Sequence, residues 1–191
     1  MEIKQETTDY LSKLTDTIKN LNLNEIETVF NVMLECYKRD GQIFIFGNGG
    51  SASTASHLTA DLNKGVSLGL DRRFKIICLN DNIPTMLAYA NDLSYNDVFV
   101  EQLKNFLKKD DVVIGISGSG NSENVLKAIE YANKVGAITI GVTGYDGGRL
   151  KNIAKYSVNA NVMDMQISED IHMIVSHIIM KLFYKKLKDE K

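Results

Sequence analysis

The sequence predicts an α/β fold in which a parallel sheet is covered by helices on both faces. Short apolar segments alternate with segments of helical periodicity along most of the 191 residues, and this alternation is typical of strands joined by crossover helices. Two of the apolar segments end in glycine-rich turns that lead into a helical pattern. Since ligands of such folds bind beyond the carboxyl ends of the strands, both turns lie where a site is expected.

Two helices are expected before the first strand. Apolar residues recur at helical spacing over 5–21, and Asn24 is a candidate N-cap for a second helix whose apolar face continues to Tyr37. No strand separates these helices, so they cannot be crossovers within the sheet. We expect them to contact other copies of the chain in preference to covering the sheet.

The remaining strands and helices follow in alternation. The segment 63–71 lacks a clear pattern and is expected to be a loop. No linker interrupts the chain, so residues 1–191 are expected to form a single domain, with the two helices in 1–40 and the α/β core in 41–191. Strands are expected at 43–46, 74–79, 112–116, 137–142 and 156–162, and helices at 54–62, 83–90, 97–107, 123–135, 168–185 and in a short segment ending at 154.

Composition limits the classes of partner. The 22 basic and 24 acidic residues are interspersed and give a net charge of −2, so no nucleic-acid partner is expected. The amino terminus lacks the order of a signal peptide, and the apolar stretch 171–180 is too short to span a membrane. Cys36 and Cys78 have neither disulfide nor metal-ligand spacing and are expected to be buried thiols. We expect a cytoplasmic protein with no membrane partner.

The first glycine-rich turn, at 47–52, suits an anion. Its glycines allow positive φ and close approach to a ligand, and the free N–H groups of the next helix point into the turn. The turn also satisfies a dinucleotide fingerprint. However, the acidic residue that recognises ribose should follow about 20 residues later, whereas the second strand ends about 30 residues on, at Asn80-Asp81. A dinucleotide-dependent enzyme is therefore the least favoured interpretation.

The second glycine-rich turn, at 117–122, repeats this design and adds three serines. Hydroxyl groups and backbone amides in such a turn each donate one hydrogen bond, which suits a compact phosphate monoester. With Ser51 in the first turn, the two turns together predict a phosphate-ester site.

Several polar motifs follow one another along the chain: 47–52, His57, Asn91-Asp92, 116–122, Gly144 with Asp146-Gly147-Gly148, Glu169-Asp170 with His172, and His177. Their order resembles that of the phosphoheptose isomerase family, a branch of the sugar isomerase (SIS) domain proteins. The resemblance covers residues 3–182 and implies a flavodoxin-like sheet of five parallel strands. It also implies a homotetramer with active sites between subunits, and conversion of sedoheptulose 7-phosphate into D-glycero-D-manno-heptose 7-phosphate.

The resemblance assigns roles to individual residues. The neighbourhood of the phosphate is formed by Ser51, Ser117, Gly118, Ser119 and Ser122. Contacts with the rest of the substrate come from Asn48, Gly49, Gly50, Asp61, Asn91, Asp92 and Glu169. A zinc ion is held by His57, Asp61, Glu169 and His177, of which Asp61 and His177 are also catalytic.

Two of these positions depart from the family pattern. Asp61 stands where better-known members carry glutamate, and Glu169 where they carry glutamine. The site thus gains a carboxylate and loses a methylene of reach, which affects substrate choice and metal identity. On one straight helix, Glu169 and His177 are separated by about 12 Å of rise, so only side chains that lean together, or side chains of different subunits, share one ion.

The chemistry fits these residue types. A ketose–aldose isomerase moves one proton between C1 and C2 through an enediol, so the site needs a base and an electrophile at the carbonyl oxygen. His177 suits the base and Asp61 its proton-transfer partner. The neutral imidazoles of His57 and His177 suit zinc.

Plainer interpretations stay open. His57 and Asp61 fit a surface pair one helical turn apart, His172 fits a buried helix face, and Arg72-Arg73 fits an exposed basic loop. For the whole chain, one alternative is a non-catalytic SIS protein that senses a sugar phosphate or binds a partner such as a bacterial replication initiator. Another alternative is an isomerase of a different sugar phosphate. A pure binding protein has no chemical need for the two histidines and two carboxylates.

Overall fold

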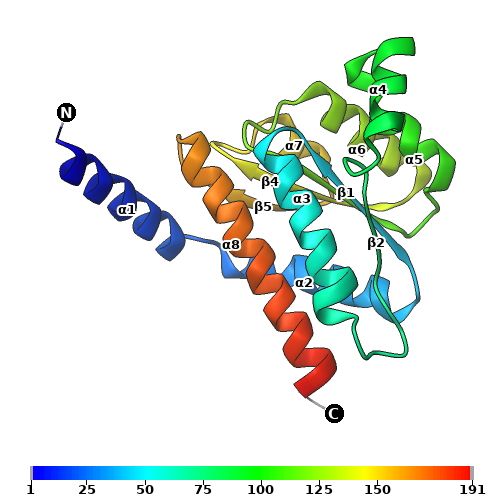
Figure 1. Cartoon of the computed structure of the whole chain (residues 1–191), viewed down its shortest axis with the longest axis horizontal. Helices are drawn as coiled ribbons and strands as arrows, with labels where there is room; N and C mark the ends of the chain where they lie inside the picture. Colours follow the sequence, from blue (N-terminus) through cyan, green and yellow to red (C-terminus); the bar gives the residue numbers. More distant parts are fainter. Residues whose placement is uncertain (1, 190–191) are drawn as a thin grey trace.

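The computed structural model describes residues 2–189 and contains one sheet of five parallel strands (Figure 1). The strand order is β2-β1-β3-β4-β5, which confirms the α/β fold class and is the flavodoxin-like order. In this order the connections reverse direction between β1 and β3. The strands are β1 (Gln42–Gly47), β2 (Lys75–Cys78), β3 (Val112–Ser117), β4 (Ile138–Gly144) and β5 (Tyr156–Ala160).

Helices cover both faces of the sheet. One face packs against α2 (Leu23–Lys38), α3 (Gly50–Ala60) with its π-helical continuation η1 (Asp61–Val66), and α8 (Met165–Tyr184) with η3 (Lys185–Asp189). The other face packs against α5 (Val100–Phe106), α6 (Glu123–Val135) and α7 (Gly148–Ile153). Between β2 and α5 the chain forms α4 (Ile83–Asp92) and the short 3₁₀ helix η2 (Tyr95–Asp97).

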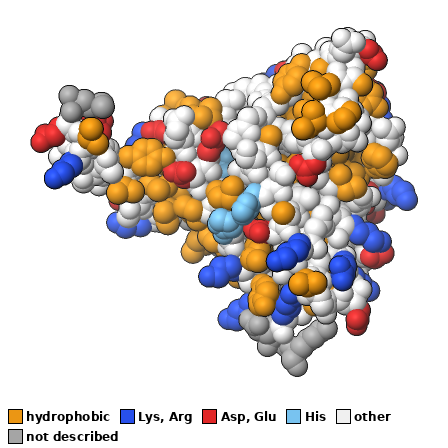
Figure 2. All heavy atoms as spheres, viewed as in Figure 1, with side chains coloured by type: hydrophobic (Ala, Val, Ile, Leu, Met, Phe, Trp, Pro, Cys, Tyr) orange, Lys and Arg blue, Asp and Glu red, His pale blue; other side chains and the backbone are white. Residues whose placement is uncertain are grey.

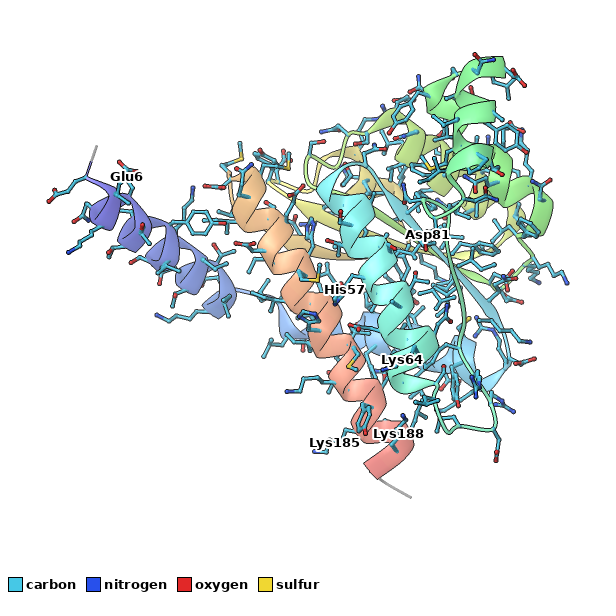
Figure 3. The ribbon with its side chains drawn as sticks, in the orientation of Figure 1. Glu6, His57, Lys64, Asp81, Lys185 and Lys188 are labelled. Carbon is cyan, nitrogen blue, oxygen red and sulfur yellow. The ribbon has the colours of Figure 1, made fainter. Side chains whose placement is uncertain are left out.

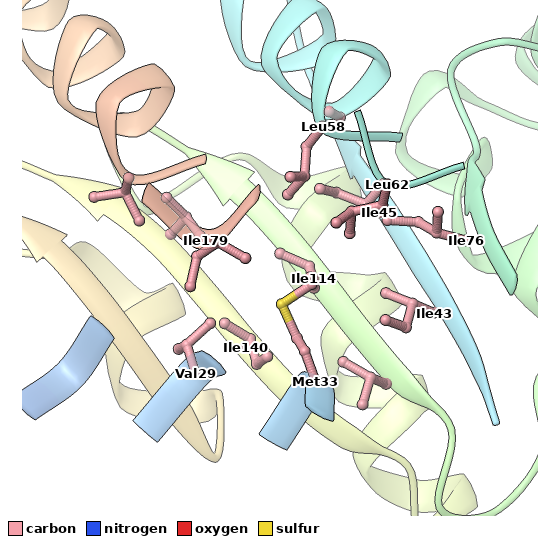
Figure 4. Packing of buried hydrophobic residues seen from close by; sticks show 14 of the residues in the cluster. Val29, Met33, Ile43, Ile45, Leu58, Leu62, Ile76, Ile114, Ile140 and Ile179 are labelled. Carbon is pink, nitrogen blue, oxygen red and sulfur yellow. The ribbon is translucent and has the colours of Figure 1, made fainter. Parts of the chain in front are cut away.

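Alternation along the central strands creates two hydrophobic cores. Ile43 and Ile45 of β1 pack beneath α2, α3 and α8, as Figure 4 shows, whereas Phe44 and Phe46 point to the opposite face. Each of these four side chains is at most 1% exposed, so β1 is buried on both faces, as expected for the interior of a parallel sheet.

The two N-terminal helices differ in their packing. α2 buries Ile26, Val29 and Met33 in the core and therefore covers the sheet, the arrangement that the sequence analysis placed second. By contrast, α1 (Ile3–Lys19) contains no buried residue and extends away from the body of the molecule (Figure 1). Contact with other copies of the chain stays a prediction, now concentrated on α1.

Several helix boundaries differ from expectation; for example, the helix expected at 97–107 is α5, Val100–Phe106. The helix after the first turn begins at Gly50 rather than Thr54, and it continues as η1 through part of the segment expected to be a loop, because Leu62 and Val66 are fully buried against the core. The last helix begins at Met165, since the side chain of Asp164 caps it by accepting a hydrogen bond from Ile167 N.

The two cysteines and the helix hydropathy agree with the sequence analysis. Cys36 and Cys78 are free and buried, and burial raises the pKa of the Cys78 thiol to about 12. Among residues 2–189, none of the helices combines the length and the apolar character needed to cross a bilayer.

Candidate active site

Both glycine-rich turns open into one cavity at the point where the strand connections reverse. Gly47, at the end of β1, is level with Ile116 near the end of β3. The cavity has a volume of about 290 Å³ and includes the first residue of α3, Gly50, and the N-cap of α6, Ser122. Its lining consists of Asn48, Gly49, Gly50, Ser51, Ile116, Ser117, Gly118, Ser119, Ser122, Met165 and Glu169.

The cavity wall is rich in hydrogen-bond donors. Ser117 Oγ lies 3.0 Å from Ser122 Oγ, and the Ser119 hydroxyl accepts a hydrogen bond from Asn121 N at 3.2 Å. The N-termini of α3 and α6 add backbone N–H groups and the positive ends of two helix dipoles. This arrangement can bind a phosphate monoester.

A third turn, at 144–148, holds the second glycine-rich turn in place through hydrogen bonds. Gly144 N donates to Gly118 O and Leu150 N donates to Gly120 O, both at 2.9 Å. A Cβ atom on Gly120 would collide with the carbonyl of Gly147, and Gly120 has φ +66°, so only glycine fits there. The glycines at 144, 147 and 148 therefore shape the serine-rich turn at 117–122, a role that their spacing in the sequence did not reveal.

Glu169 lies beside the serines, near the start of α3. A Cβ atom on Gly50 would collide with the Glu169 carboxylate, so the absence of a side chain at Gly50 makes room for it. Glu169 therefore faces the anion-binding end of the cavity. Within this chain it is not among the residues gathered around the histidines.

The two exposed histidines meet between α3 and α8. His57 Nε2 lies 3.0 Å from His177 Nε2, and 3.4 Å from Asp61 Oδ2. One ligand atom from each of the three residues lies within 4.8 Å of the others. Figure 3 shows His57 between the two helices, and Figure 2 shows the histidine rings at the surface. His57 and Asp61 are therefore more than a pair along one helix, because a third polar side chain from α8 joins them.

The spacing of these donors fits a zinc ion. Zinc in proteins is bound by neutral imidazole nitrogens and carboxylate oxygens, and a tetrahedral ion holds two nitrogens about 3.3 Å apart. The 3.0 Å between the two imidazole nitrogens is close to that separation. Three protein donors leave a tetrahedral position for a water molecule or a substrate oxygen, as in catalytic sites.

Three predicted substrate residues do not line the cavity of this chain: Asp61, which lies beside His57, and Asn91 and Asp92. Asn91 and Asp92 are exposed at the end of α4, where Asn91 Nδ2 donates to Asp92 Oδ1 at 2.9 Å. Neither side chain is among the cavity-lining residues. Contact of Asn91 and Asp92 with the sugar stays a prediction.

His172 belongs to the core, as its plainer interpretation predicted. Its side chain is 2% exposed. Burial lowers the pKa of His172, so the ring is neutral near pH 7. Arg72 and Arg73 are exposed in the loop before β2.

Met165 and Ile116 are lining residues that the sequence analysis did not assign to the site. A Cβ atom on Gly118 would meet the Met165 sulfur, so this methionine packs directly on the serine-rich turn at 117–122. Asp164 is the sequence signal that was overlooked. As the N-cap of the last helix, it places Met165 in the first turn of that helix, beside the cavity.

The fold and the cavity define an α/β protein with a cleft rich in hydrogen-bond donors at the reversal point of a flavodoxin-like sheet. A model of the SIS domain family matches residues 8–144. Phosphoheptose isomerase from Helicobacter pylori is 35% identical over 178 residues, covering 93% of this chain and 91% of the relative. The corresponding protein from Clostridium acetobutylicum is 34% identical over 170 residues, covering 88% and 86%. The chain belongs to the phosphoheptose isomerase family of SIS-domain proteins.

Solved structures agree on the fold. Phosphoheptose isomerase from Neisseria gonorrhoeae superposes with a TM-score of 0.88 at 24% identity, covering 95% of this chain and 98% of that one. The Francisella tularensis enzyme gives the same TM-score at 22% identity, with 97% and 99% covered. At these identities the likeness concerns the fold alone.

Proposed function

We propose that the protein is a ketose–aldose isomerase that converts sedoheptulose 7-phosphate into D-glycero-D-manno-heptose 7-phosphate. The observation that carries this proposal is that α3 joins two chemically different sites. Its first residue, Gly50, lines the serine-rich cavity, and His57 and Asp61 at its other end meet His177. Seven residues of helix separate Gly50 from His57, a rise of about 10 Å, which an extended sugar phosphate of six or seven carbons can bridge.

The residues divide the work as follows. Ser51, Ser117, Ser119 and Ser122, with Gly118 and the two helix N-termini, bind the phosphate. This places C1 and C2 towards the histidines. His177 removes the proton from C1 of the ketose and Asp61 assists its delivery to C2, so that an enediol forms and collapses to the aldose.

His57, Asp61 and His177 would hold a zinc ion. Because a ring nitrogen bound to zinc has no lone pair left for a proton, the second oxygen of Asp61 would then take the proton in place of His177. Bound there, the ion would polarise the carbonyl and hydroxyl oxygens of the substrate as a Lewis acid. Glu169 would join this set only if its own side chain changed position, or if Glu169 of another subunit reached the ion. Its place at the cavity fits contact with the substrate.

The proposal includes a cytoplasmic homotetramer and a single SIS domain spanning the chain. The exposed apolar side chains of α1 supply surface for contacts between copies. Active sites between subunits would let Asn91 and Asp92 of one copy reach the sugar bound by another.

A proton NMR time course with sedoheptulose 7-phosphate, with and without added Zn²⁺, tests the proposed activity. We expect resonances of an aldoheptose phosphate to appear in the zinc sample. If the sugar phosphate raises the melting temperature but no aldose forms, a non-catalytic sugar-phosphate sensor or an isomerase of another substrate takes the place of this proposal.

A further inference from the structure

Asn48 belongs to a hydrogen-bond network that reaches beyond the cavity. Its Nδ2 donates to Asn124 Oδ1, and Asn124 Nδ2 donates back to Asn48 Oδ1, both at 2.9 Å. Asn124, on α6, is 2% exposed. Its Oδ1 also accepts a hydrogen bond from Val125 N at 2.9 Å. Because a backbone N–H can only donate, this bond fixes which end of each amide faces the other.

Tyr95 completes the network. Its hydroxyl donates to Asn48 Oδ1 at 2.8 Å, so this oxygen accepts two hydrogen bonds. Within residues 2–189, the Asn48 nitrogen uses one of its two N–H groups, in the bond to Asn124, and keeps the other free. Since Asn48 lines the cavity, the free N–H is available to an oxygen of a bound ligand. The Tyr95 side chain is otherwise exposed, with 54% of the residue accessible, so core packing does not explain where its hydroxyl lies.

The backbone around Tyr95 is held in place independently of the cavity. Ser94 caps η2 by accepting a hydrogen bond from Asn96 N, and Asp97 forms an ion pair of 2.8 Å with Lys127 on α6. The next residues, Val98 and Phe99, are fully buried. Contacts outside the cavity thus hold η2 in place, and Tyr95 extends from η2 to Asn48, the residue after β1.

We propose that Tyr95 is a positioning residue of the sugar-phosphate site, whose hydroxyl holds the Asn48 amide with its free N–H directed at the sugar. This inference rests on the proposed function. Without the hydroxyl, Asn48 Oδ1 loses one of its two donors and the amide is held by Asn124 alone, so it is less ordered before the ligand binds. Loss of one such hydrogen bond weakens binding by roughly threefold to tenfold. The phosphate is held by the serines, which the substitution leaves in place.

The test compares Tyr95→Phe with Tyr37→Phe. Tyr37 is the matched control because its hydroxyl also donates one hydrogen bond, to Arg72 O at 2.9 Å, far from the cavity. Calorimetry measures the affinity for two ligands: inorganic phosphate, and the alditol made by reducing sedoheptulose 7-phosphate, which has no carbonyl and cannot be isomerised. We expect Tyr95→Phe to weaken alditol binding threefold to tenfold, with phosphate affinity unchanged, and Tyr37→Phe to change neither.

A double-mutant cycle tests whether Tyr95 acts through Asn48. In an Asn48→Ala background, Tyr95→Phe should have no further effect on alditol affinity. The inference is overturned if Tyr95→Phe binds the alditol like the wild type, if its effect persists in that background, if both ligands weaken together, or if the wild type does not bind the alditol.

Turnover of sedoheptulose 7-phosphate by the wild type separates this inference from the proposed function. Coupling between Tyr95 and Asn48 in alditol binding without any turnover would uphold the positioning role and reject the isomerase. Turnover with no effect of Tyr95→Phe on alditol affinity or KM would uphold the isomerase and reject the positioning role.

Discussion

Glu169 places a negative charge in the cavity for which we propose phosphate binding. Its carboxylate lies against Gly50, where the N-terminus of α3 offers a favourable potential. A bound phosphate would use the same N-terminus, so the two negative charges would repel one another. The family resemblance implies glutamine at this position. In this structure, glutamate in place of glutamine adds a negative charge beside the serine-rich turn at 117–122.

Glu169→Gln is expected to tighten the binding of inorganic phosphate, because it removes this repulsion while keeping the shape of the side chain. The gain should be larger at low salt, where screening is weak. Titration calorimetry at two salt concentrations measures both effects. Glu27→Gln, on the exposed surface of α2, serves as the control for net charge. Unchanged or weaker phosphate binding by Glu169→Gln would contradict the placement of this carboxylate.

His172 makes the stability of the fold depend on pH. Burial lowers its pKa in the folded state, whereas the unfolded chain has the ordinary value of about 6.5. Below that pH the unfolded state binds more protons, so the free energy of unfolding falls as the pH decreases through about 6.5.

Urea denaturation at pH 7.5 and pH 5.5 measures this effect. We expect the wild type to lose more stability over the interval than His172→Gln, whose side chain does not titrate. The other two histidines are present in both proteins and cancel in the comparison. Equal losses in the two proteins would show that His172 takes up no extra proton on unfolding.

At the scale of elements, α1 stands apart from the rest of the fold. Two polar contacts tie it to α8: Tyr10 donates to Asp170 at 2.6 Å, and Lys13 pairs with Asp164 at 2.9 Å. The hydrogen bond to Asp170 raises the pKa of Tyr10 to about 12. The apolar residues Leu11 and Ile18 of α1 are 56% and 41% exposed. The helix is thus held by polar contacts and has an uncovered apolar side.

Replacing Leu11 and Ile18 together by glutamine is expected to lower the molar mass of the assembly from that of a tetramer, because buried apolar area stabilises contacts between copies. Light scattering after size exclusion measures the mass, and circular dichroism checks that the helices remain. Asp9→Asn with Asp16→Asn, at exposed polar positions of the same helix, is the control. An unchanged mass for the glutamine variant would remove α1 from the interface.

The regular elements were predictable because local patterns specify them. The apolar runs of β1 and β3 are each followed by glycine and then by a helical pattern, and this identified them as strands that lead into helices. Residues 63–66 of the π-helical segment η1 were expected to be loop, because glycine and polar residues conceal the buried position Val66. The hydrogen bond from Tyr95 to Asn48 joins residues 47 positions apart, and no local pattern encodes it.

At the scale of the whole molecule, the strand order creates the site. Because β1 and β3 are neighbours, two turns that are far apart in the sequence open into one cavity. The sequence supported a phosphate cradle, since both turns carry their own glycines and serines. The sequence could not show that Glu169 lies at the serine-lined cavity and not beside His177, because this depends on how α8 packs. Nor could it show that Asn91 and Asp92 lie outside the cavity, which depends on how α4 packs.

The central claim is that the serine-lined cavity binds the substrate while the residues at the other end of α3 perform the chemistry. Measuring binding and turnover in the same samples of Asp61→Asn and His177→Ala tests it most directly. Calorimetry with the alditol of sedoheptulose 7-phosphate reports binding, and proton NMR with the sugar phosphate itself reports turnover. Each variant is expected to keep the alditol affinity of the wild type and to lose turnover by roughly 10²- to 10⁴-fold, the usual contribution of a general acid or base. Wild-type turnover in both variants would contradict it.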